Sequence, residues 1–176
     1  MTDKNQRACD MLSTALDMEK KGKAFYDRAA RNCRSGQVKD IFRMLAEQEV
    51  VHIERINRLY ESLTGGKGWC ELEYKDSKHL SIGKVFSEMA RKHGANIKTY
   101  TTDIEALDAG IDMEARSLKF YQDQLEAAGD PMEKEFLEKM AAEEKEHHAT
   151  LSDMRLYLSD PSSWFSEKER TGLDGA

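Results

Sequence analysis

A glutamate followed three residues later by a histidine occurs twice in this sequence, 95 positions apart, and this repeated pair constrains the chain more than any other feature. A glutamate and a histidine three residues apart lie one turn apart on the same side of a helix, so both can face one ion. A single pair of this kind is common by chance among charged residues, but here one register aligns four pairs of identical residues. The aligned pairs are Glu19 with Glu114, Tyr26 with Tyr121, Glu49 with Glu144 and His52 with His147. This repeat indicates an internal duplication.

The composition predicts an all-α chain that folds as a single domain over residues 1–176. Only 2 Pro and 11 Gly interrupt a sequence rich in helix formers, and 176 residues suit one core. Apolar residues at helical spacing predict a four-helix bundle of two duplicated antiparallel helix hairpins. The expected parts are a hairpin over 7–63, a long crossover with a short extra helix over 64–101, a hairpin over 102–158 and a tail over 159–176.

Local signals predict where helices begin. Ser35 is a candidate N-cap of the second long helix, Thr102–Glu105 fits a capping box for the third, and Asp130-Pro131 fits the start of the fourth. We expect Trp164 and Phe165 to fold the tail back onto the bundle, because large apolar rings are rare in a free tail. The third helix is expected to bury a row of residues: Leu107, Ile111, Glu114, Leu118, Tyr121 and Leu125.

The candidate ligands of both hairpins are expected at one height in the bundle. Glu19 and Glu49 lie about 15 residues on either side of the first turn, and Glu114 and Glu144 about 15 on either side of the second. At a rise of about 1.5 Å per residue, each pair sits roughly 22 Å from its turn. The crossover would let the hairpins pack with these levels coincident.

Four glutamates meeting inside an apolar core need cations. Each buried carboxylate faces a desolvation penalty of several kcal/mol as well as the repulsion of the others. Two divalent ions balance four negative charges, and two neutral imidazoles complete the coordination. Oxygen ligands mixed with nitrogen suit two Fe ions, with Mn or Zn possible in the same set. The predicted metal ligands are Glu19, Glu49, His52, Glu114, Glu144 and His147.

Other roles for these residues stay open at the level of sequence. Glu19 and Glu114 would be surface charges if the buried stripe were rotated by one position. Tyr26 and Tyr121 lie two turns from those glutamates, and each is expected either to hydrogen-bond a ligand carboxylate on a neighbouring helix or simply to pack. His148 offers no properly spaced pair with Glu143 and is expected on the solvent side.

The charge balance excludes some partners. A net charge of −6 and a pI near 5.5, without a cluster of Lys and Arg, argue against nucleic acid. No apolar run reaches the ~20 residues that span a bilayer, so we expect no membrane partner and a cytoplasmic location. Three widely spaced cysteines without a Cys-x-x-Cys pair fit a reducing compartment.

The ligand-bearing segments resemble a known family. Leu16–Tyr26 (LDMEKKGKAFY) and Leu45–His52 (LAEQEVVH), each repeated in variant form 95 residues later, resemble the rubrerythrin branch of the ferritin-like superfamily. The resemblance covers roughly residues 7–158 and implies a ferritin-like fold. It implies a non-haem di-iron centre that reduces hydrogen peroxide or dioxygen, with the six residues above as ligands and with Glu49 and Glu144 bridging. It also implies a homodimer or higher homo-oligomer.

Two departures from the family pattern bear on function. Rubrerythrins proper carry a rubredoxin-like module with paired Cys-x-x-Cys, so electrons would come here from a separate donor such as a rubredoxin. They also carry a further glutamate one turn past the third-helix ligand, where this chain has Ser117. The alternatives are an iron storage or ferroxidase protein of the bacterioferritin type and a non-catalytic metal-binding bundle.

Overall fold

The computed structural model describes residues 3–72, 81–95 and 97–173, and these residues form six helices. Four long helices, two in each hairpin, make the bundle, and two short helices lie outside the hairpins. The helices are α1 (Asp3–Asn32), α2 (Gly36–Thr64), α3 (Ile82–His93), α4 (Thr101–Ala127), α5 (Pro131–Ser159) and α6 (Pro161–Leu173). The predicted all-α, ferritin-like four-helix bundle is confirmed.

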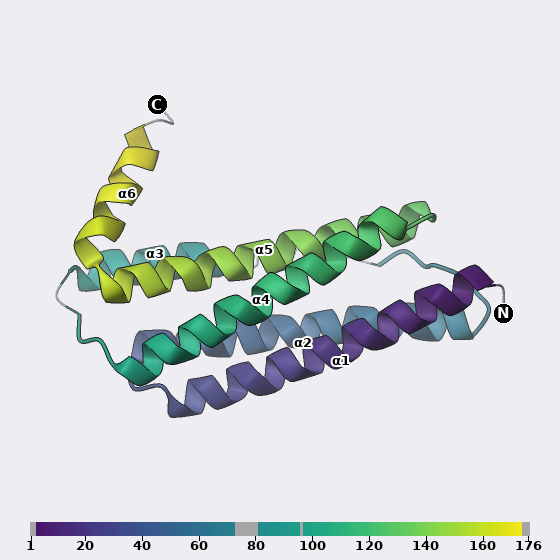
Figure 1. Cartoon of the computed structure of the whole chain (residues 1–176), viewed down its shortest axis with the longest axis horizontal. Helices are drawn as coiled ribbons and strands as arrows, with labels where there is room; N and C mark the ends of the chain where they lie inside the picture. The colour runs from purple at the N-terminus through teal and green to yellow at the C-terminus, as the bar shows by residue number, and fades with distance from the viewer. Residues whose placement is uncertain (1–2, 73–80, 96, 174–176) are drawn as a thin grey trace.

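The long helices pair as the duplication predicts. Figure 1 shows α1 lying along α2 and α4 lying along α5, each pair joined by a short turn. The short helix expected in the crossover is present as α3, which packs against α5 and α2. The crossover segments 73–80 and 96 lie outside the described residues.

The apolar core is split into two clusters by a polar layer halfway along the bundle. One cluster lies toward the α1–α2 turn and includes Phe42, Leu107 and Leu151. The other lies toward the α4–α5 turn and includes Leu12 and Phe136. On each long helix, the residues between the two clusters are the candidate ligands. Their carboxylates are therefore enclosed by apolar packing above and below.

The buried row of α4 differs from the predicted one. Ile111, Leu118 and Leu125 are only half-buried. The fully buried positions of α4 are Asp103, Leu107, Gly110, Glu114, Ser117 and Tyr121. Small residues face inward because α4 approaches its neighbours closely: a Cβ atom at Gly110 would lie 3.0 Å from Leu151 Cδ1. Hydrophobicity therefore misplaced the stripe, while the ligand and tyrosine positions within it were right.

One predicted N-terminal cap is wrong, and the other is right in position but lacks the expected side-chain hydrogen bond. α4 begins at Thr101, so the proposed capping box at 102–105 lies inside the helix. Ser35 stands at the N-cap position of α2, but its hydroxyl donates to Gln37 Oε1. The buried Asp103 carboxylate accepts instead from the backbone amides of Arg34 and Ser35, at 2.7 and 2.8 Å. A side chain of α4 thus holds the turn before α2 and ties the two hairpins together.

The start of α5 is as predicted. The Asp130 carboxylate accepts from the amides of Met132 and Glu133, and Pro131 is the first helical residue. This cap closes the second hairpin.

The tail forms α6, which contacts the bundle through residues of its first two turns, including an ion pair between Lys168 and Asp153 of α5. Trp164 is buried and packs its ring against Phe86 of α3 and Tyr157 of α5. Phe165 adds an edge contact with Tyr157. Figure 1 shows the rest of α6 extending away from the bundle. The expectation that these two rings fold back is confirmed, whereas the later residues of α6 project outward.

Within the described residues, none of the helices combines the length and apolar character needed to cross a membrane.

Candidate metal centre

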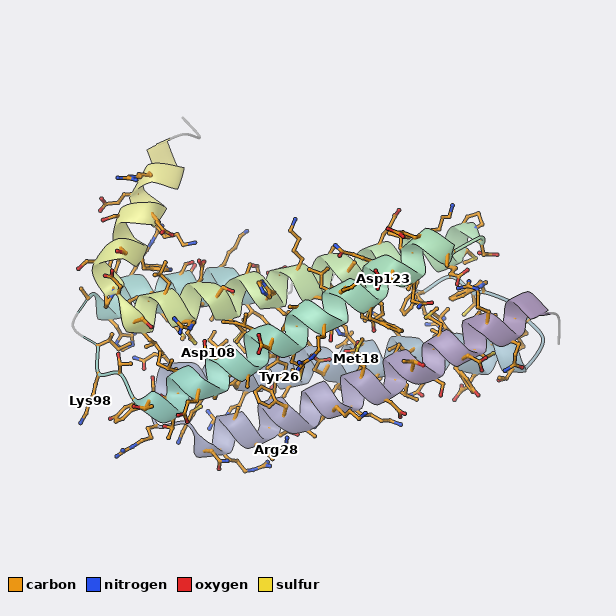
Figure 2. All side chains as sticks on the ribbon, viewed as in Figure 1. Met18, Tyr26, Arg28, Lys98, Asp108 and Asp123 are labelled. Carbon is orange, nitrogen blue, oxygen red and sulfur yellow. The ribbon has the colours of Figure 1, made fainter. Side chains whose placement is uncertain are left out.

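All four long helices contribute to one buried acidic layer. Its six side chains come from α1, α2, α4 and α5 and are each at most 3% exposed: Glu19, Glu49, His52, Glu114, Glu144 and His147. The helical period brings them to the interior, since they continue the same stripe as the apolar residues on either side. Figure 2 shows Tyr26, two turns from Glu19, lying between α1 and α4, while Arg28 lies on the outside of α1.

The donor atoms form two groups that share one glutamate. Atoms of Glu19, Glu49 and His52 lie within 4.8 Å of one another. The same limit holds for a second group, which consists of Glu49, Glu114, Glu144 and His147. The structure therefore brings all six predicted residues together, in two sets that could each hold one ion. Their role as ligands stays a prediction that the following observations support.

Unpaired buried atoms in this layer fit metal ions. Among the described residues, no hydrogen-bond partner is found for Glu49 Oε2, Glu114 Oε2, Glu144 Oε1 or His147 Nδ1. A buried polar atom without a partner costs about 1–3 kcal/mol, and more when it is charged. Both imidazoles turn Nδ1 toward the carboxylates, with His52 Nδ1 at 3.1 Å from Glu19 Oε2 and His147 Nδ1 at 3.6 Å from Glu114 Oε1. Cations between these atoms would satisfy them together.

In the first hairpin, burial and the closeness of the two carboxyl groups give Glu19 and Glu49 different pKa values. Desolvation, followed by the hydrogen bond with Glu19, raises the pKa of Glu49 well above its usual value. Burial would also raise the pKa of Glu19, but hydrogen bonds with Glu49 and His52 outweigh it and lower that pKa.

The second hairpin repeats this division. Desolvation and the negative charge of Glu114 raise the pKa of Glu144. Desolvation of Glu114 is outweighed by the nearby Glu144 carboxyl and the nearby His147 ring, and the pKa of Glu114 falls to about 2. One glutamate of each hairpin thus favours the protonated form without a cation, as expected of like charges in a closed core.

The two tyrosines cross between the hairpins. Tyr26 of α1 donates its hydroxyl hydrogen bond to Glu114 of α4, and Tyr121 of α4 donates to Glu19 of α1. Each tyrosine therefore orients the candidate ligand of the other copy. Burial, and then the nearby carboxylates, raises the pKa of both phenols, which stay protonated as donors. The predicted hydrogen bonds to carboxylates on a neighbouring helix are present.

Glu143 belongs to the site, although its sequence context did not show this. Its carboxylate lies 2.7 Å from His52 Nε2 and pairs with Arg55 at 2.8 and 2.9 Å. Desolvation is outweighed by the hydrogen bond with His52 and by the charges of His52 and Arg55, and the pKa of Glu143 falls to about 2. A carboxylate that binds Nε2 fixes the orientation of the imidazole ring and makes Nδ1 a stronger metal ligand. The contact joins residues 91 positions apart, and no spacing rule within one helix could have found it.

The same repeat register makes the two halves unequal. Glu143 corresponds to Gln48 in the first copy, so the carboxylate beside His52 has an amide as its counterpart.

His148, expected on the solvent side, is half-buried. Ser117 is 7% exposed and lies one turn after Glu114 on the buried face of α4.

Gly22 makes room for the glutamate that both groups share. A Cβ atom at this position would lie 3.3 Å from Glu49 Cδ and 3.3 Å from Glu49 Oε1. The glycine interrupts a long helix, where it costs about 1 kcal/mol relative to alanine. Its place against the Glu49 carboxylate gives that cost a structural reason.

Comparisons with known proteins agree with this geometry. A model of the Rubrerythrin family matches residues 10–155, a span that includes all six candidate ligands and both tyrosines. Searches of curated proteins and of solved structures gave no match. The match covers most of the chain and nearly all of the four long helices, and we conclude that this chain belongs to the rubrerythrin family.

Proposed function

We propose that this protein holds two iron ions in its acidic layer and reduces hydrogen peroxide or dioxygen with electrons from a separate donor. The observation that carries the proposal is the pair of donor groups sharing Glu49, in which four buried polar atoms lack a hydrogen-bond partner among the described residues. The family match supports a di-iron site, and the choice of substrate follows from the resemblance described above.

Each ion would be held mainly by one hairpin. The first group offers Glu19 and His52, the second offers Glu114 and His147, and Glu49 belongs to both. Glu144 Oε1 lies 3.2 Å from His52 Nδ1, so this carboxylate also reaches the first group. These positions support Glu49 and Glu144 as the bridging carboxylates.

The bound iron would supply the electrons that reduce the oxidant, and the protein would control its surroundings. Tyr26 and Tyr121 hold the terminal carboxylates Glu114 and Glu19 by hydrogen bonds, while Glu143 holds His52. The two apolar clusters exclude bulk water from above and below the layer. The hydroxyls of Tyr26 and Tyr121 stay protonated beside these carboxylates, so each holds a proton next to the site without adding charge.

The proposal is tested by loading the purified protein with ferrous iron under anaerobic conditions and adding peroxide with a chemical reductant. We expect about two iron ions per chain, in line with two carboxylate-rich groups, and repeated peroxide consumption. Glu49→Gln should lose iron binding and turnover together, because both groups lose a ligand. Glu47→Gln, an exposed neighbour on the same helix, is the matched control.

Three results would contradict the proposal. A single round of iron oxidation without turnover would argue against a peroxidase. Binding of many iron ions per chain would indicate storage instead. Equal iron content in Glu49→Gln and Glu47→Gln would show that the acidic layer is not the metal site.

A further inference from the structure

A chain of aromatic rings connects the acidic layer to the surface at one end of the bundle. Tyr121, which donates to Glu19, lies with its ring centroid 6.4 Å from that of Phe136. Phe136 lies in turn 6.4 Å from the ring of Trp69, in the segment that follows α2. Tyr121 and Phe136 are fully buried and Trp69 is half-buried, so this ring chain runs from a candidate ligand to solvent.

The pseudo-equivalent tyrosine has different neighbours. Each tyrosine meets the phenylalanine before it, at 5.3 Å for Tyr26 and 5.4 Å for Tyr121, but Tyr26, which donates to Glu114, stacks on Phe42 at 5.7 Å. The second tryptophan, Trp164, is 1% exposed and packs with Phe86 and Tyr157. The duplication thus provides two tyrosines in matched positions, of which Tyr121 has ring contacts that lead to a tryptophan near solvent.

Trp69 lines a surface cavity of about 340 Å³. Arg7, Asp130 and Glu133 form other parts of its wall, and Arg7 pairs with the buried Glu133. The cavity is large enough for a small soluble reductant to approach the indole. Asp130 and Glu133 are tied to the start of α5, so the wall around Trp69 is fixed by the fold.

We propose that Tyr121 and Trp69 form a one-electron route between the metal centre and this cavity. Tyrosine and tryptophan are among the side chains most readily oxidised by one electron, and ring contacts at these separations allow an electron to cross an intervening phenylalanine. The inference rests on the proposed function, since it assigns a path by which the same site obtains an electron when its iron cannot supply one.

The electron balance shows when the route is needed. Hydrogen peroxide takes two electrons and two protons to become two water molecules. If bound iron supplied only one of these electrons, Tyr121 could supply the second while its phenol proton moved along its hydrogen bond to Glu19, and solvent would supply the two protons that peroxide takes up. Trp69 then reduces Tyr121, which recovers its proton, and the indole loses its own proton to water. A thiol or another one-electron reductant in the cavity restores Trp69.

The route is tested by mapping oxidation within the protein rather than by activity. Iron-loaded protein is treated with excess peroxide without reductant, and the oxygen atoms added to Trp69 and Trp164 are measured by peptide mass spectrometry. Absorbance records the iron oxidised in the same samples. We expect iron-dependent oxidation of Trp69, and its loss to the iron-free level in Tyr121→Phe. Tyr26→Phe, which removes the matching hydrogen bond, should retain it per iron oxidised.

A second measurement needs no iron. Trp69 in the metal-free protein is oxidised by a photoexcited ruthenium complex with a sacrificial oxidant, and tyrosyl radical is recorded by electron paramagnetic resonance. We expect part of the radical signal to disappear in Trp69→Phe and in Tyr121→Phe, but not in Tyr26→Phe.

The outcomes separate the route from the proposed function. Protein that oxidises no iron would contradict the proposed function, and the photochemical experiment would still decide whether the route exists. Normal iron oxidation with Trp69 oxidation unchanged in Tyr121→Phe would overturn the route alone. The same holds if the photochemical signal is equal in all variants.

Discussion

Replacing Gly22 by alanine should stabilise the metal-free protein and weaken its hold on metal. Gly22 lies in the interior of α1, where alanine is favoured by about 1 kcal/mol. For a chain of this size that corresponds to a rise in Tm of about 3 °C. The new Cβ atom would lie 3.3 Å from Glu49 Cδ and Oε1, so the carboxylate must move by a few tenths of an ångström. Without metal, the Glu49 side chain can turn aside.

With metal bound, that movement has a cost because the ligand position is fixed by the ion. Changes next to ligands typically lower metal affinity by about 10- to 100-fold. Each tenfold loss removes about 1.4 kcal/mol of the stabilisation that saturating metal provides. The expected loss exceeds the gain in helix stability. Relative to the unmodified protein, Gly22→Ala should therefore unfold at a higher temperature without metal and at a lower temperature with metal.

The assay compares thermal unfolding with and without zinc, and measures zinc affinity by competition with a fluorescent chelator. Gly36→Ala is the control, since no other part of the described chain lies within 4 Å of a Cβ placed there. Equal zinc affinities for Gly22→Ala and Gly36→Ala would refute the reasoning and show that the Glu49 carboxylate does not bind metal where the structure places it.

Three further predictions concern pH, the hairpin junction and the site surroundings. Desolvation raises the pKa of Glu49 and Glu144 in the folded metal-free protein, so their stabilising effect is present at low pH and is lost as pH rises through those values. Urea midpoints of the metal-free protein should therefore decrease as the pH is raised above about 5, whereas the midpoints of the zinc-bound protein should not. Asp103→Ala should lower the free energy of unfolding by about 1–3 kcal/mol in urea titrations, since two amides before α2 lose their acceptor. Glu143→Gln should weaken zinc binding by roughly tenfold in chelator competition, because the His52 ring loses its carboxylate partner.

Matched controls make each of these results decisive. A midpoint that rises with pH in the metal-free protein would contradict the protonation of Glu49 and Glu144. Glu105→Ala changes an exposed residue of the same helix turn, and an equal loss in both variants would show that the Asp103 carboxylate has no special role. Glu138→Gln changes an exposed carboxylate on α5, and zinc affinity equal to that of Glu143→Gln would show that Glu143 does not act on His52.

Sequence reasoning failed where a side chain acts on a different helix. Thr102–Glu105 has the composition of a capping box, yet Asp103 points across to the turn before α2. Glu143 has no partner at helical spacing, yet it reaches His52 of α2. Both residues satisfy groups that are distant in sequence. Local pattern rules compare a residue only with its own helix. They therefore placed Asp103 in a capping box of its own helix and gave Glu143 no role.

The sequence by itself determined the helices, their pairing and the identity of the candidate site. The helical period decides which side chains share a face, and the repeat that relates Glu19 to Glu114 and Glu49 to Glu144 needs no coordinates to be seen. Only the tertiary structure decided that Glu49 lies in both donor groups, that Tyr121 reaches both Glu19 and the ring of Phe136, and that Gly22 faces a carboxylate. Such contacts depend on the axial shift and rotation of one helix against another. Those quantities follow from the packing of the whole core, and no single segment encodes them.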